Sequence, residues 1–191
     1  MPQPDHLVIV MIPDTHKLHR ELQVPDGDIL IHAGDVTTFS KSAAAIRDFN
    51  DWLGELPHRW KIVTPGNHEF FLEADHSKRR LISNASTLIS EGVEVSGLKV
   101  WGSPMTSLYG GAFGRSSDQD RIKIYSGIPD DTDILVTHGS PYGILDPAPG
   151  SDDHSGCHQL LAAVRRVKPM IHVFGHVHGG YGTFSTPTCF L

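Results

Sequence analysis

Residues 25–35 read Pro25-Asp-Gly-Asp-Ile-Leu-Ile-His-Ala-Gly-Asp35. The first three residues are typical of a turn, and the apolar run from Asp28 to Ala33 has the length and composition of a buried strand. An acidic residue, Asp35, follows this strand directly behind a glycine. In open α/β sheets, polar residues just beyond the carboxyl ends of strands line the ligand crevice. The segment therefore predicts both a strand and one member of a site.

The rest of the chain repeats this arrangement of short apolar strands separated by helical segments. Further strands are expected at Leu7–Ile12, Trp60–Val63, Asp133–Thr137 and Met170–Phe174, with two or three more within Thr87–Trp101. Helices are expected at Lys41–Leu56, Phe70–Ile82 and His158–Val167. Residues 104–131 are rich in Gly, Ser and Asp, which predicts a long functional or mobile loop. The alternation predicts a single α/β domain over residues 1–191.

The composition argues against several classes of partner and location. The net charge is −6 with neutral histidines, so duplex nucleic acid is not an expected partner. The chain lacks an apolar run of ~18 residues and a secretory signal, so we expect a cytoplasmic protein without a membrane partner. Its two cysteines do not make a disulfide framework. Composition leaves the oligomeric state open.

The chain contains 13 histidines, and several of them follow predicted strands together with Asp or Asn. Two others, His32 and His172, fall inside apolar strands, and we expect them to be core or supporting groups instead of ligands. The residues at the strand ends are Asp14, His16, Asp35, Asn67, His138, His176 and His178. Each short motif alone is weak, but five of them at strand ends in one chain predict a common site.

The chemistry of these seven side chains indicates a metal centre. Imidazole, carboxylate and amide donors without thiolate suit Mn²⁺, with Fe, Zn, Ni or Mg as alternatives. Seven donors are too many for one ion, so the sequence predicts two divalent ions that share a carboxylate. Such pairs clamp the attacking and leaving oxygens of a phosphoryl group and lower the pKa of bound water.

The motif order Asp-x-His, Gly-Asp, Gly-Asn-His-Glu, His-Gly and Gly-His-x-His, from Asp14 to His178, resembles the calcineurin-like metallophosphoesterases. The closest likeness is to the metallophosphoesterase-domain-containing subfamily of animals and fungi. The resemblance implies a four-layer α-β-β-α sandwich. Relatives continue further beyond the last motif, so a shortened C-terminal sheet edge is expected, with exposed apolar surface near Phe184 and Phe190.

The resemblance also implies a role for each site residue. The first metal would take Asp14, His16, Asp35 and His178, and the second would take Asp35, Asn67, His138 and His176. Asp35 would therefore bridge the two ions and count as catalytic. His68 would be a separate catalytic group that protonates the leaving oxygen or stabilises the developing charge, and Asn67 and His68 would bind substrate. Arg115 is a further candidate for phosphate binding, because a guanidinium suits phosphate.

These roles predict a hydrolase that cleaves a small phosphodiester, with cyclic nucleotides as candidate substrates, through in-line attack of a metal-bound hydroxide. A protein phosphatase ranks lower, because Gly34-Asp35 is followed by Val36-Thr37-Thr38 without the arginine of that group. A nuclease lacks the basic groove it would need. An inactive metal-binding scaffold of the same fold stays open. Pro13, which removes a backbone donor beside the first motif, counts weakly in its favour.

Overall fold

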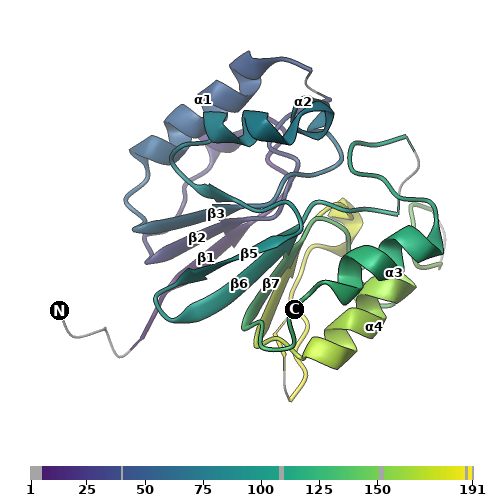
Figure 1. Ribbon diagram of the computed structural model, residues 1–191. Coiled ribbons are helices and arrows are strands. Elements are labelled where there is room, and N and C mark those ends of the chain that lie inside the picture. Colours follow the sequence, from purple (N-terminus) through teal and green to yellow (C-terminus); the bar gives the residue numbers. More distant parts are fainter. Residues whose placement is uncertain (1–5, 40, 108–109, 151–152, 188, 191) are drawn as a thin grey trace.

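The computed structural model describes residues 6–39, 41–107, 110–150, 153–187 and 189–190. It contains two four-stranded sheets, each covered on its outer face by helices (Figure 1). The first sheet has the order β1-β2-β3-β4 and is parallel throughout. Its strands are β1 (Ile9–Ile12), β2 (Ile29–His32), β3 (Trp60–Val63) and β4 (Ser86–Thr87).

The second sheet has the order β5-β6-β7-β8. Its strands are β5 (Glu91–Val95), β6 (Leu98–Ser103), β7 (Ile134–Thr137) and β8 (Ile171–Phe174). The β5–β6 pair is an antiparallel hairpin, whereas β6, β7 and β8 run parallel. Beyond β8, Phe190 pairs with Ile171 in an isolated bridge and is 37% exposed.

Two helical layers complete the sandwich. The first comprises α1 (Ala43–Glu55) and α2 (Phe70–Ala74), and the second comprises α3 (Asp118–Ser126) and α4 (His158–Val167) (Figure 1). Short 3₁₀ turns lie at η1 (His19–Glu21), η2 (His76–Leu81) and η3 (His178–Gly180). No helix in the described ranges is both long and apolar enough to cross a membrane.

The alternation of side chains along the strands explains the layers. On β2, Ile29 and Ile31 face the second sheet, whereas Leu30 packs beneath α1 against Phe49. On β7, Leu135 packs toward α3 and α4 while its neighbours in the strand join the core between the sheets. Each sheet is therefore apolar on both faces, which requires a cover on each side. The predicted α-β-β-α sandwich is confirmed.

Two predicted elements differ from the structure. The expected helix Phe70–Ile82 breaks at Asp75, whose backbone is extended and whose carboxylate caps the following 3₁₀ turn by accepting from the Ser77 N–H at 3.0 Å. The expected loop 104–131 contains α3. This helix lacks a clear apolar stripe and is held by Tyr125, which is only 1% exposed, and by packing against α4. Tertiary contacts therefore override a weak local pattern there.

Candidate metal centre

The predicted ligands meet where the carboxyl ends of the two sheets come together. Asp14 follows β1, Asp35 follows β2, Asn67 follows β3, His138 follows β7 and His176 follows β8. Backbone bonds tie neighbouring loops together within each sheet. The Asp14 N–H donates to the Gly34 carbonyl at 2.9 Å, and the Gly175 N–H donates to the His138 carbonyl at 3.1 Å. The site is therefore built from five strand ends that lie far apart in the sequence.

Four of the seven predicted ligands have a left-handed backbone. The φ angles are +52° for Asp14, +44° for His16, +54° for Asp35 and +72° for His176. Non-glycine residues in this region are strained, and such strain persists only where the surroundings hold it in place. Here the His16 N–H donates to the Asp35 carbonyl at 2.9 Å, which fixes two of these loops together. The concentration of strain indicates that side-chain placement matters more than local stability at these positions.

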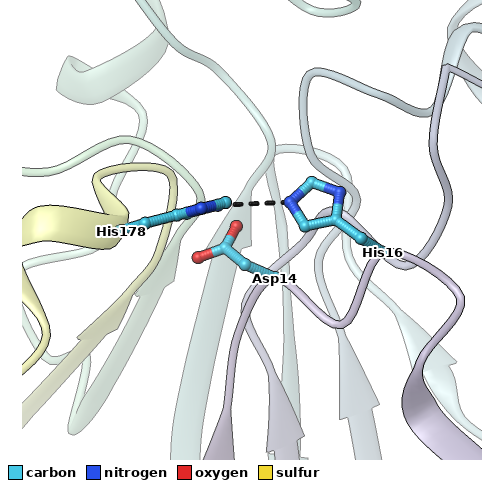
Figure 2. Close-up of side chains that lie close together, drawn as sticks. All are labelled: Asp14, His16 and His178. Carbon is cyan, nitrogen blue, oxygen red and sulfur yellow. Dashed lines mark hydrogen bonds between the residues drawn. The ribbon is translucent and has the colours of Figure 1, made fainter.

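The first cluster of possible ligands is Asp14, His16 and His178, shown in Figure 2. The carboxylate of Asp14 lies beneath the two imidazoles, whose Nε2 atoms approach to 3.2 Å. On its other side, Nδ1 of His16 lies 3.2 Å from the Thr37 carbonyl, to which it donates. A neutral imidazole that donates from Nδ1 presents a lone pair at Nε2. This is the arrangement that metal-ligating histidines usually have.

The second cluster is Asp35, His138 and His176, with Asn67 between the imidazoles. Oδ1 of Asn67 lies 2.8 Å from Nε2 of His138 and 2.8 Å from Nδ1 of His176. His138 also donates from Nδ1 to a carbonyl, that of Ala33, at 2.9 Å. Its Nε2 therefore faces a carboxylate oxygen and an amide oxygen. A cation bound among these three donors would be attracted by all of them.

Asp35 connects the two clusters. Its Oδ1 lies 3.3 Å from Nε2 of His138, and its Oδ2 lies 3.8 Å from Nε2 of His16. Its side chain is only 3% exposed, so these charges interact with little solvent screening. Although burial opposes the charged form, His138 and His68 lower the pKa of Asp35. The carboxylate is therefore ionised and within reach of both donor sets, which is the position that a bridging ligand requires.

The protonation states fit a divalent cation in each cluster. Burial lowers the pKa of His176 to about 4, so its imidazole is neutral and can act as a ligand at pH 7. Burial also disfavours the charged form of His138, but the Asp35 carboxylate outweighs it and raises the pKa of His138. A site that attracts a proton between a carboxylate and an imidazole also attracts a metal ion, which would displace that proton. The chemistry of the donors therefore fits two divalent ions.

Glu69 supports this centre, although it was assigned no predicted role beyond its place in the motif. Its side chain is fully buried, and Oε2 accepts from the N–H groups of Gly66 at 2.6 Å and Asp35 at 3.0 Å. Oε1 accepts from the N–H and the hydroxyl of Thr37, both at 2.9 Å. Burial, reinforced by the nearby charge of Asp35, raises the pKa of Glu69 to about 7. Glu69 thus ties the Asp35 loop to the Asn67 loop.

Two glycines allow the loops to approach closely. A Cβ atom on Gly66 would lie 2.2 Å from Oδ1 of Asp35, and one on Gly34 would lie 2.4 Å from Nδ1 of His138. Gly34 also has a φ of +103°, which disfavours any side chain. The sequence signal for this close approach was the glycine directly before Asp35 and the glycine directly before Asn67.

A pocket of about 480 Å³ opens over the clusters. Its described lining residues are His16, Asp35, Phe39, Asn67, His68, Gly110, Gly111, His176 and His178. Both Asn67 and His68, the predicted substrate-binding pair, face this space. The volume falls in the ~300–1,000 Å³ range of small-molecule sites.

Arg115, the third predicted substrate contact, lies elsewhere. Its guanidinium lies 3.6 Å from the carboxylate of Glu73 and donates to the Gly114 carbonyl at 2.7 Å. It lines a separate pocket beside Trp101 and Lys123. The structure therefore does not bring Arg115 to the metal clusters. In contrast, His32 and His172 are buried in the core as expected.

Comparison with known proteins agrees with this geometry. The calcineurin-like phosphoesterase family matches residues 8–180. Human metallophosphoesterase domain-containing protein 1 is 36% identical over 97% of this chain, and the chain spans 64% of the human protein's length. The UPF0046 protein C25E10.12 of Caenorhabditis elegans is 39% identical over 95% of this chain and 73% of its own length.

Solved structures show the same fold at low sequence identity. TT1561 of Thermus thermophilus aligns with a TM-score of 0.62 at 12% identity, over 96% of this chain and 87% of that one. At this identity the likeness concerns the fold alone, whereas the family match extends over all of the strand-end motifs. The chain belongs to the calcineurin-like phosphoesterase family.

Proposed function

We propose that this protein is a metal-dependent hydrolase of small phosphodiesters, with cyclic nucleotides as the first candidate substrates. The observation that carries the proposal is the pair of donor clusters that Asp35 connects beneath one pocket. We assign Asp14, His16, Asp35 and His178 to one ion and Asp35, Asn67, His138 and His176 to the other. Mn²⁺ is the first choice for both positions, because the donors combine imidazole with oxygen ligands.

The two ions would supply an activated water at neutral pH and would neutralise charge on the phosphate oxygens. The protein itself would orient the ester. Nε2 of His68 lies 3.7 Å from Oδ2 of Asp35, and His68 forms a third group of possible donors with His16 and Asp35, although it is not one of the predicted ligands. We assign it to the substrate side, where His68 would protonate the leaving oxygen or stabilise its developing charge. Asn67 would contribute its amide beside the phosphate.

The described lining of the pocket supports a small substrate over a phosphoprotein. It contains no arginine, whereas a guanidinium would suit a dianionic phosphate monoester. The glycines Gly110 and Gly111 also line the pocket, whose volume of about 480 Å³ leaves room for more than a phosphoryl group. The protein carries a net charge of −6, which disfavours long nucleic acid substrates.

The test is a metal and substrate panel. Protein stripped by a chelator is reloaded with Mn²⁺, Zn²⁺, Ni²⁺, Fe²⁺ or Mg²⁺, and bound metal is counted. Each form is assayed on cyclic nucleotides, bis(p-nitrophenyl) phosphate, p-nitrophenyl phosphate and a phosphopeptide. We expect chelation to abolish diester hydrolysis and Mn²⁺ to restore it.

Two variants and one control sharpen the result. Asp35→Asn should lower both metal content and turnover, whereas His68→Ala should keep the metals and lose turnover. Asp51→Asn changes an exposed aspartate on α1 and should behave like the wild type. Hydrolysis that survives thorough chelation would contradict the proposal. Two bound ions without turnover of any substrate would instead identify a metal-binding scaffold.

A further inference from the structure

Phe39 occupies an unusual position at the rim of the metal pocket. Its backbone has a φ of +48°, in the left-handed region that a bulky residue rarely adopts. The residue is 62% exposed and its ring lies 6.4 Å from that of Phe70, so Phe39 sits on the surface and not in the core. A strained backbone and an exposed ring at the same residue both carry a cost, which points to a local role in the pocket it lines.

Phe39 contacts His68 in two ways. The two rings stack, with centroids 3.7 Å apart and an interplanar angle of 24°. The Phe39 N–H also donates to Nδ1 of His68, at 3.3 Å. One residue thus holds both the plane of the imidazole and one of its nitrogens.

The hydrogen bond determines what the other nitrogen can do. Because Nδ1 accepts, the proton of the neutral imidazole lies on Nε2. This Nε2 is the atom on the side of the Asp35 carboxylate, at 3.7 Å from Oδ2. On another side His68 meets His16 edge-on, with centroids 4.6 Å apart. The imidazole is therefore packed between two rings and presents a donor to the pocket.

We infer that Phe39 is a positioning residue, which holds His68 with its Nε2–H directed at the leaving oxygen of the phosphodiester. The inference rests on the proposed function, since it assigns His68 its role in ester cleavage. In that step the P–O bond to the leaving group breaks and its electron pair stays on oxygen, where the developing charge accepts a hydrogen bond from the Nε2–H of the neutral imidazole. The proton that finally neutralises this oxygen comes from water, so His68 remains neutral throughout. The exposed face of Phe39 needs no substrate contact for this role.

Leaving-group dependence provides a readout that a merely structural role would not move. A good leaving group such as p-nitrophenolate needs little stabilisation of its charge, whereas a basic alkoxide or unsubstituted phenolate needs a hydrogen-bond donor. Phe39→Leu should therefore lower kcat by ~10-fold or more for poor leaving groups, part of the ~10²–10³-fold that one positioned donor to a developing oxyanion contributes. It should lower kcat less for p-nitrophenyl esters and change KM little. Phe39→Tyr keeps the ring and should restore the wild-type profile.

The matched control is Phe184→Leu, which removes another exposed phenylalanine ring, 44% exposed and outside the described pocket lining. It should leave kcat and its leaving-group dependence unchanged. Equal kcat values for wild type and Phe39→Leu on poor leaving groups would overturn the inference. A change confined to KM would also overturn it and would make Phe39 a platform for substrate.

A second measurement does not depend on turnover. In Zn²⁺-loaded protein labelled with ¹⁵N-histidine, the His68 signals are assigned by their loss in His68→Ala. We expect the Nε2–H tautomer in the wild type and in Phe39→Tyr. Phe39→Leu keeps the backbone N–H but removes the stack that holds the imidazole against it, so the preference should weaken there. An Nδ1–H tautomer in the wild type would refute the positioning even if the enzyme is active. If no substrate is turned over, the proposed function fails while the tautomer still decides the contact between Phe39 and His68.

Discussion

Gly66→Ala tests whether close backbone packing places the shared carboxylate. The added Cβ would lie 2.2 Å from Oδ1 of Asp35, 2.4 Å from its backbone nitrogen and 2.7 Å from Cε1 of His138. Non-bonded atoms of this kind need ~3.2 Å or more, so the Asp35 loop must move by roughly 1 Å. Metal sites hold their ligand distances within ~0.2 Å, so this displacement exceeds what the site can absorb.

We expect two effects of different size. Overpacking of this kind costs ~1–3 kcal/mol of stability, so the variant should fold with a lower urea midpoint. Metal affinity should fall more severely, by ~10–100-fold, the loss typical of a disturbed ligand environment. Isothermal titration with Mn²⁺ measures the affinity, and urea unfolding of the metal-free protein measures the stability.

The matched control is Gly182→Ala, whose Cβ would meet Cδ2 of Leu145 at an ordinary 3.5 Å. It should change neither quantity. If Gly66→Ala binds two equivalents of Mn²⁺ with wild-type affinity, the site does not depend on this close approach, and the packing argument is wrong.

Three further outcomes are expected. Glu69→Gln should lower the free energy of unfolding by ~1–3 kcal/mol in urea titrations. The glutamine amide nitrogen would face a buried backbone N–H that accepts no hydrogen bond and that a glutamate oxygen satisfies in the wild type. An unchanged urea midpoint would contradict this. Burial lowers the pKa of His172 from 6.5 to about 3. The contribution of the neutral imidazole to the free energy of unfolding is therefore complete above pH 6.5 and falls as the pH drops toward 3. The loss should reach ~2 kcal/mol at pH 5 and shrink in His172→Gln, and equal pH slopes for the two proteins would refute it. Chelation should lower the thermal midpoint, since ligand at ~100 times its Kd adds ~2.7 kcal/mol, and Mn²⁺ should restore it.

The pattern of apolar strands was sufficient to predict the layered architecture. Short runs such as Ile29–His32 are buried on both faces, and in a chain of this size such strands need a cover on each side. The two wrongly predicted elements, the helix at Phe70–Ile82 and the loop at 104–131, lie where the local sequence pattern does not decide the secondary structure. In α3 the helix depends on Tyr125 reaching the core, and the break at Asp75 depends on a capping bond that overrides the helical pattern around it. Contacts between distant segments, absent from local periodicity, decided the first case, and a single side-chain bond decided the second.

For the predicted ligand set too, the motifs predicted some features and contacts in the folded chain decided the others. The motifs at the strand ends placed Asp14, Asp35 and His138 in one neighbourhood, because the carboxyl ends of packed parallel strands lie together. They could not show which nitrogen of His138 faces the site, since that depends on the Ala33 carbonyl behind it. They also could not distinguish Arg115, which pairs with Glu73 outside the pocket, from a phosphate contact.

The order of residues was enough to predict the fold class and the side chains offered as ligands, because strand periodicity and side-chain chemistry are local properties. The resemblance of the motifs pointed to the family. How those side chains are held depended on the folded chain. Asp35 lies within reach of both clusters, Glu69 joins their loops and Phe39 stacks on His68. Most of these contacts link segments separated by about thirty residues or more, and their distances follow from backbone paths that no short motif encodes. A metal site depends on such distances, so its chemistry could be predicted from the chain while its geometry could not.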